Sequence, residues 1–160
     1  MTRAWRIRAW GEQDLEQAFV GQGVIAISAD DIGDASGLSD EAIRAKLRSA
    51  HPDRSGAAIS TFVGYWRAFV SEMQFDDVVA LPLARRRVAV GLINGPYDRV
   101  ASEPNVRLRN ARTVQWLRTI DRDQVDEDLR RGINAPGTLW AFRSPDAAER
   151  LLLAAGRTGE

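Results

Sequence analysis

Strand-like and helix-like patterns of apolar residues alternate along the first half of the chain. Residues 3–8 (R-A-W-R-I-R) alternate polar and apolar side chains, which is typical of a half-buried strand, and residues 24–27 form a short apolar strand. Between these strands, residues 11–21 carry apolar side chains at helical spacing. Two more helices are expected over residues 39–50 and 55–72, because each stretch begins at a serine that can cap the first turn.

The second half of the chain is dominated by strand patterns. The β-rich runs 78–83 and 88–93 flank Arg85-Arg86-Arg87, which predicts a hairpin. The remaining expected elements are an extended piece from Tyr97, an exposed loop over 101–110, a strand over 112–119, a helix over 122–131, a strand over 138–142 and a helix over 146–154. Strands with helices inserted between the second and third predict an α+β fold, with a small, mixed, curved β-sheet or barrel flanked by helices.

Length and composition favour one soluble unit. The 160 residues suffice for a single domain, expected over residues 1–160, and 44% hydrophobic with 28% charged residues is typical of a folded domain. No apolar run approaches the roughly 18 residues of a membrane span, and the N-terminus lacks the pattern of a signal peptide. We therefore expect a cytoplasmic protein without a membrane partner.

The scarcity of reactive side chains excludes several classes of enzyme. The chain has no cysteine, which excludes a disulfide framework, a cysteine nucleophile and a thiolate metal site. A single histidine, His51, argues against a histidine zinc site, a serine–histidine triad and a His-Asn-His nuclease. The carboxylates resemble turn residues, so no set of base, acid and electrophile stabiliser can be assembled. We expect no catalytic residue, no metal and no cofactor, and we favour a binding module over an enzyme.

A strong charge asymmetry is hidden by the zero net charge. Residues 12–41 hold eight acidic side chains and no basic one, whereas residues 84–118 hold eight arginines against Asp98 and Glu103. Arginine clamps phosphates in a bidentate fork and stacks on bases. A segregated basic segment is therefore the footprint of a nucleic-acid binder, and a solvated charged surface is the alternative.

The tripeptide His51-Pro52-Asp53 resembles the loop of J-domain co-chaperones, where it joins two antiparallel helices and contacts a chaperone partner. A J-domain is all-helical. Here an apolar strand precedes the pair of helices and a β-hairpin is expected after it. We interpret Pro52 as the residue that ends a helix.

A second similarity covers nearly the whole chain. Its most specific segments are G-L-I-N-G-P-Y (residues 91–97) and V-Q-W-L-R (residues 114–118). The supporting segments are the strand with Trp5, Arg6 and Arg8, then G-V-I-A-I (23–27), S-G-L (36–38), F-V-S-E-M (69–73) and D-D-V-V-A-L-P (76–82). In this order they resemble the N-terminal domain of Mrr-like and HNH-type modification-dependent (type IV) restriction proteins, a PUA-like domain related to EVE, YTH and ASCH domains.

The resemblance implies a mixed barrel that binds double-stranded DNA and flips a methylated base into an aromatic pocket. The resemblance also implies a nuclease domain or partner, fused or recruited, and this chain itself contains no nuclease motif. The resemblance leaves open whether the base is 5-methylcytosine, its hydroxymethyl form or N6-methyladenine. An RNA-modification reader of the YTH or ASCH kind and a small PUA-like nuclease remain as alternatives.

The candidate pocket combines aromatic rings with polar side chains that can read a base edge. Tyr65 and Trp66 are adjacent on an expected helix, so their side chains point about 100° apart and at most one faces the core. Trp5, Trp116 and Trp140 are expected in the core. The expected pocket residues are Trp10, Ser28, Asp30, Thr61, Tyr65 and Trp66. The expected phosphate contacts are Arg8, Arg67, Arg85, Arg86, Arg87, Arg107 and Arg109.

Overall fold

A curled β-sheet forms the centre of the computed structural model, which describes residues 2–10, 12–27 and 30–156. Over those residues its seven strands are Ala4–Ile7 (β1), Val24–Ala26 (β2), Val78–Leu83 (β3), Arg87–Ile93 (β4), Asp98–Arg99 (β5), Asn110–Asp121 (β6) and Leu139–Ala141 (β7). The strand order is β2-β6-β4-β3-β1-β7, and β5 pairs with β6. The expected α+β class with a mixed, curved sheet is confirmed.

The long strand β6 joins two parts of the sheet. Its first residues pair with β2 and β5, and residues 114–121 pair with β4. The register shifts between Val90 and Gly91, where a Cβ on the glycine would lie 2.7 Å from the Trp116 side chain. Glycine at this position lets the tryptophan cross the neighbouring strand. Among the described strands, all pairings are antiparallel except that of β1 with β3.

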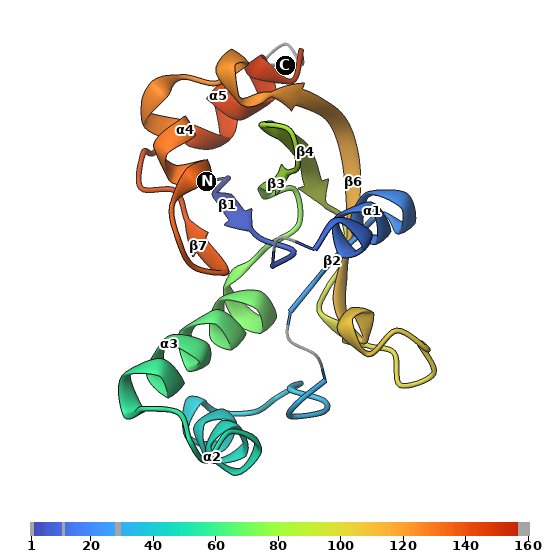
Figure 1. Ribbon diagram of the computed structural model, residues 1–160, viewed down its shortest axis with the longest axis vertical. Helices are drawn as coiled ribbons and strands as arrows, with labels where there is room; N and C mark the ends of the chain where they lie inside the picture. The colour runs from blue at the N-terminus through green and yellow to red at the C-terminus, as the bar shows by residue number, and fades with distance from the viewer. Residues whose placement is uncertain (1, 11, 28–29, 157–160) are drawn as a thin grey trace.

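Helices cover the sheet at two ends of the molecule (Figure 1). The α-helices are Gln13–Gln22 (α1), Asp40–Ala50 (α2), Gly56–Arg67 (α3), Glu127–Asn134 (α4) and Ala147–Ala154 (α5). The pair α2 and α3 lies at the foot of the view, and α4 and α5 lie at the top (Figure 1). Ser39 and Ser55 cap α2 and α3, since each side chain accepts a hydrogen bond from the backbone N–H three residues on.

Two hydrophobic cores occupy the two faces of the sheet. Alternate residues of β3 point to opposite faces, so Val79 and Leu81 join one core, whereas Val78 and Ala80 join the other. The larger core includes residues of α1, α2 and α3, and the smaller one includes residues of α4 and α5. Burial on both faces explains why residues 78–83 form a continuous apolar run.

The helix expected over residues 55–72 changes its hydrogen bonding near its end. It is α-helical to Arg67 and continues as a π-helix over Ala68–Glu72. The last carbonyls of a helix have no partner within it. Here the buried guanidinium of Arg112 donates to the carbonyls of Phe69 at 2.6 Å and Val70 at 3.1 Å, and also to Gly95 at 3.1 Å. This arginine therefore fastens the end of α3 to the sheet.

Three expected elements differ from the structure. The exposed loop expected over 101–110 contains a 3-10 turn, Val106–Leu108, and buries both Leu108 and Asn110. The strand expected over 112–119 begins at Asn110 because of its pairing with β5. The helix expected over 122–131 divides into a 3-10 turn, Arg122–Gln124, and α4. Pairing or packing with distant segments sets the first two boundaries, whereas a local capping box between Asp121 and Gln124 begins the 3-10 turn.

The carboxylate of Asp77 fixes the start of β3 against β1. It is 3% exposed and accepts hydrogen bonds from the Trp5 indole at 2.9 Å, the Arg3 backbone N–H at 3.1 Å and the Gln74 backbone N–H at 3.0 Å. Asp77→Ala leaves these donors without their acceptor, at about 1 kcal/mol each. We expect the free energy of unfolding, measured by urea denaturation, to fall by about 3 kcal/mol.

The neighbouring residue provides the control for this substitution. Asp76 is exposed and has a φ of 70°, a conformation that asparagine tolerates. Asp76→Asn should change the free energy of unfolding by less than about 0.5 kcal/mol. Equal effects of the two substitutions would contradict the role assigned to Asp77.

Candidate functional site

An aromatic cleft of about 390 Å³ lies beside the α2–α3 pair, near the C-terminal end of β1. Its volume falls within the range of small-molecule binding sites, about 300–1,000 Å³. The lining residues come from segments far apart in the sequence: Trp10, Ile27, Asp31, Leu47, His51, Arg54, Phe62, Tyr65, Trp66 and Thr138. Three of the expected pocket rings, Trp10, Tyr65 and Trp66, are thus brought together.

The adjacent rings on α3 take different positions, as their angular separation requires. Trp66 is buried and packs edge-on against Tyr97, with ring centroids 6.4 Å apart. Tyr65 is half-buried, packs against Phe62 at 6.0 Å between centroids, and accepts a hydrogen bond from the Thr138 backbone N–H at 3.3 Å. Trp66 is therefore the core-facing member of the pair, and Tyr65 is the accessible one.

Trp10 borders the cleft in an unusual backbone conformation. It follows β1, its side chain is 37% exposed, and its φ is 52°. Bulky residues rarely adopt positive φ, and such strain concentrates at functional sites. Trp5 is buried in the core as expected, whereas Trp116 and Trp140 are half-buried. Neither Trp116 nor Trp140 lines this cleft.

A carboxylate–imidazole pair supplies the polar part of the cleft. The Nε2 atom of His51 lies 2.6 Å from Oδ2 of Asp31, and both side chains are largely buried. Arg54 places its guanidinium carbon 4.5 Å from the ring centroid of Phe62. Sequence reasoning did not assign Asp31, His51, Arg54 or Phe62 to the site. The helical spacing of Phe62, Tyr65 and Trp66 was the signal that could have identified Phe62.

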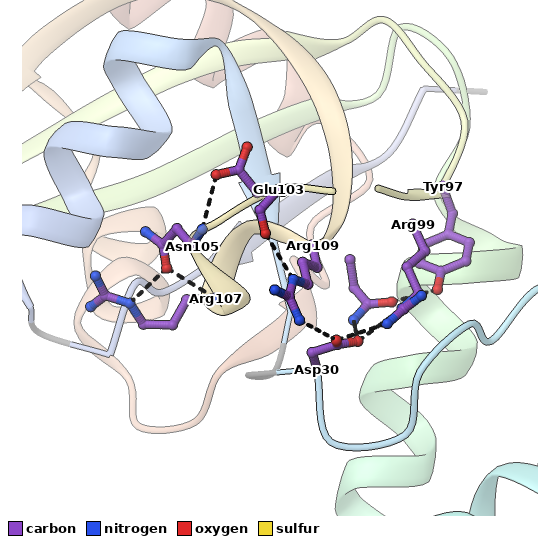
Figure 2. A network of polar contacts seen from close by, with 8 residues as sticks. Asp30, Tyr97, Arg99, Glu103, Asn105, Arg107 and Arg109 are labelled. Carbon is purple, nitrogen blue, oxygen red and sulfur yellow. Dashed lines mark hydrogen bonds and ion pairs between the residues drawn. The ribbon is translucent and has the colours of Figure 1, made fainter. Parts of the chain in front are cut away.

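The expected edge-reader Asp30 is engaged elsewhere, in the polar network of Figure 2. Its carboxylate accepts two hydrogen bonds from Arg99, at 2.9 and 2.8 Å, and others from Arg109 at 3.2 Å and Asn110 at 3.3 Å. These arginines lower the pKa of Asp30 to about 2, the hydrogen bond from Arg99 having the largest effect. Asp30 therefore anchors the segment that presents Asp31 to the cleft.

Tyr97 extends this network to the following segment. Its hydroxyl donates to Oδ1 of Asn110 at 2.6 Å and accepts from the backbone N–H of Ala35 at 3.0 Å. Residues 30–35 are thus held to β5 and β6 at both ends. Of the other expected edge-readers, Thr61 is exposed and donates to the Ala57 carbonyl, outside the cleft lining, and Ser28 lies outside the described residues.

Five of the seven arginines expected at phosphates are paired with carboxylates. Arg67 pairs with Asp40 at 2.8 Å, Arg86 with Asp123 at 2.9 Å, Arg87 with Asp121 at 3.8 Å, Arg109 with Asp30 at 3.2 Å, and Arg107 with both Glu12 and Asp14. Among the described residues, Arg8 and Arg85 form no ion pair. Arg85 lies in the tight turn between β3 and β4, where its φ is 62° and its side chain is exposed.

The part of the chain that the structure describes contains no group of three or more histidine, aspartate or glutamate side chains able to hold a metal ion. None of its helices is long and apolar enough to cross a membrane.

Comparison with protein families matches residues 5–134 to a family described as "Domain of unknown function (DUF8426)". No curated protein matches the chain. Among solved structures, the chain is similar to the YTH domain of the Zygosaccharomyces rouxii MRB1 protein in complex with N6-methyladenosine RNA. The sequence identity is 9%, the TM-score is 0.48, and the alignment covers 99% of this chain and 89% of that chain.

The low pKa of Asp30 predicts a specific acid sensitivity. Its pKa lies below the ordinary 3.8, so the stabilising charge is present above pH 3.8 and is lost as the pH falls towards about 2. Asp30→Asn should lower the free energy of unfolding at pH 7 and reduce its decline between pH 4 and 2. Urea denaturation across this pH range measures both effects. Parallel declines in the variant and the parent would contradict the prediction.

Proposed function

This chain belongs to the DUF8426 family, a domain of unknown function, and we propose that it binds nucleic acid and holds an extruded, modified base in the aromatic cleft. The observation that supports this proposal is that Trp10, Tyr65 and Phe62 line one cleft, with Trp66 on its buried side. A flipped base requires a flat slot between rings, and rings from two separate segments, the segment after β1 and the helix α3, meet here.

The energetics of base capture are consistent with such a cleft. Extrusion of a base costs a few kcal/mol, and stacking on an aromatic ring returns about 1–3 kcal/mol. Trp10 and Tyr65 together can therefore offset extrusion. The Asp31–His51 pair supplies hydrogen-bonding groups for the edge of the base, beside the rings. A methyl group that reaches an apolar wall adds about 0.8 kcal/mol, which is about fourfold in affinity.

Double-stranded DNA is the ligand that we propose, in the setting of a modification-dependent restriction system with a fused or recruited nuclease. The resemblance of residues 91–97 and 114–118 to the domains of such proteins supports this assignment. The arginines of the β3–β4 turn provide cationic groups for the phosphates, and Arg85 is the member without an ion pair among the described residues. The alternative ligand is RNA with a modified base, and the binding experiment below distinguishes it from DNA.

The proposal predicts selectivity that depends on Trp10. Matched duplexes and single-stranded RNAs that differ in one methylated base should be compared by fluorescence anisotropy. We expect the modified duplex to bind at least fourfold more tightly than the unmodified one, and Trp10→Ala to abolish the difference. Phe75→Ala is the matched control, because this ring is 65% exposed and lies outside the cleft lining.

Two results would contradict the proposal. Equal affinity for the methylated and unmethylated nucleic acids would show that the protein does not recognise the modified base. A folded Trp10→Ala protein that still discriminates between them would show that the base binds outside this cleft. Discrimination on RNA alone would replace DNA with RNA as the ligand.

The ion pairs of the arginines predict which of them contribute to the salt dependence of DNA affinity. A phosphate contact adds about 0.9 to the slope of log affinity against log salt concentration. Arg85→Gln should flatten this slope by about 0.9, whereas Arg107→Gln should change it much less, because Arg107 already pairs with Glu12 and Asp14. DNA affinity measured between 50 and 200 mM salt, a range of about fourfold, tests this difference. Equal changes for the two variants would show that the internal pairs open on binding.

A further inference from the structure

A second cavity, of about 290 Å³, contains two arginines without a carboxylate partner. It lies among the end of β1, α1, the end of β3 and the 3-10 turn after β6, and Arg8, Glu16 and Arg122 are its charged lining residues. Among the described residues, neither Arg8 nor Arg122 forms an ion pair, whereas Arg86, Arg87, Arg99 and Arg109 do.

The two guanidinium groups are held in place by main-chain and amide oxygens. Arg122 donates to the carbonyls of Leu83 at 2.8 Å and Arg87 at 3.0 Å, and to Oδ1 of Asn134 at 2.8 Å. Arg8 donates through Nη2 to the carbonyls of Asn134 at 3.1 Å and Ala135 at 2.8 Å. Each guanidinium has five N–H donors, so both retain donors after these bonds are counted. Their positions are therefore fixed while hydrogen-bonding capacity remains.

An unsatisfied donor accompanies this arrangement. The Nε atom of Arg8 is buried and has no hydrogen-bond acceptor among the described residues. Buried polar groups nearly always have a partner, and the Nε atom of Arg6 is the other orphaned side-chain donor of the described residues; Arg8, unlike Arg6, lines this cavity.

The local charge also favours an anion. Burial lowers the pKa of Arg122, and the like charges of Arg8 and Arg86 lower it further, while Glu16 opposes the shift. One carboxylate oxygen of Glu16 is occupied by the backbone N–H of Ala84 at 2.9 Å. Arg8 and Arg122 against Glu16 leave one positive charge in excess.

We propose that Arg8 and Arg122 form a binding site for the tetrahedral oxyanion of a phosphate group. Guanidinium groups recognise phosphate oxygens through paired N–H donors, and two fixed guanidiniums at one cavity present such donors without reorganisation. Glu16 at the same cavity limits the affinity, because its carboxylate repels the anion.

The site adjoins the aromatic cleft, and its assignment to a nucleic-acid phosphate rests on the proposed function. Arg8 precedes Trp10 by two residues, so their Cα atoms are at most about 7 Å apart. The backbone N–H of Arg8 also donates to the carbonyl of Thr138, a residue of the cleft, at 2.9 Å. A phosphate at Arg8 and Arg122 would therefore belong to the backbone near the base held by Trp10.

The oxyanion site can be tested without nucleic acid. Inorganic phosphate is titrated into the full chain at constant ionic strength, and the Arg8 Nε–H and Ala84 backbone N–H resonances are followed by NMR. We expect saturable shifts, at least tenfold weaker phosphate binding in Arg122→Gln and tighter binding in Glu16→Gln. Arg131→Gln is the control, because that exposed side chain pairs with Glu127 on α4 and should leave the affinity unchanged.

Resonance shifts that do not saturate with phosphate would overturn the proposal that Arg8 and Arg122 form a phosphate site. Unchanged affinity in Glu16→Gln would also overturn it, and this variant decides the question if Arg122→Gln fails to fold. A thymidine dinucleotide with one phosphodiester should compete with phosphate, and failure to compete would overturn the assignment to a nucleic-acid backbone. Trp10→Ala should retain phosphate binding while losing base discrimination, so the failure of either proposal is seen separately.

Discussion

The position of α3 depends on one buried arginine. Arg112 projects from β6 and takes up the Phe69 and Val70 carbonyls that the end of the helix leaves unpaired, together with the carbonyl of Gly95. Burial lowers the pKa of this guanidinium, and the carbonyl dipoles offset the cost of that burial. Because α3 carries Tyr65 and Trp66, the geometry of the cleft follows from this attachment. Arg6 plays a matching role on β1, where it donates to the carbonyls of residues 135–137, beside Thr138.

The cleft is thus assembled from parts that the chain supplies at long sequence separation, each held by polar contacts outside the cleft itself. Trp10 is positioned by the end of β1, and Asp31 by the anchoring of Asp30 to Arg99 and Arg109. The network in Figure 2 therefore supports the site without lining it. Acidic residues near the N-terminus and arginines of the second half, which appear as separate charge blocks in the sequence, pair with one another in the fold.

Most elements and the different exposure of Tyr65 and Trp66 could be predicted from local patterns, and the partners of charged side chains could not. Ser39 and Ser55 indicate helix starts directly, and the 100° angle between Tyr65 and Trp66 lets at most one of the two rings face the core. By contrast, the choice between Asp30 and Asp31 as the cleft residue depends on which one meets Arg99, about 70 residues away in the chain. The pairing of Arg107 with Glu12 and Asp14 is equally invisible to local periodicity.

The most direct test of the central claim is the behaviour of the five tryptophan indole resonances when a modified duplex is added. We expect a saturable shift of the Trp10 indole N–H with the modified duplex and a much smaller one with the unmodified duplex. The indoles of Trp5 and Trp116 should stay in place, because they donate to Asp77 and to the Phe19 carbonyl away from the cleft. A Trp10 resonance that does not move, or that moves equally with both duplexes, would contradict the claim that this cleft holds the base.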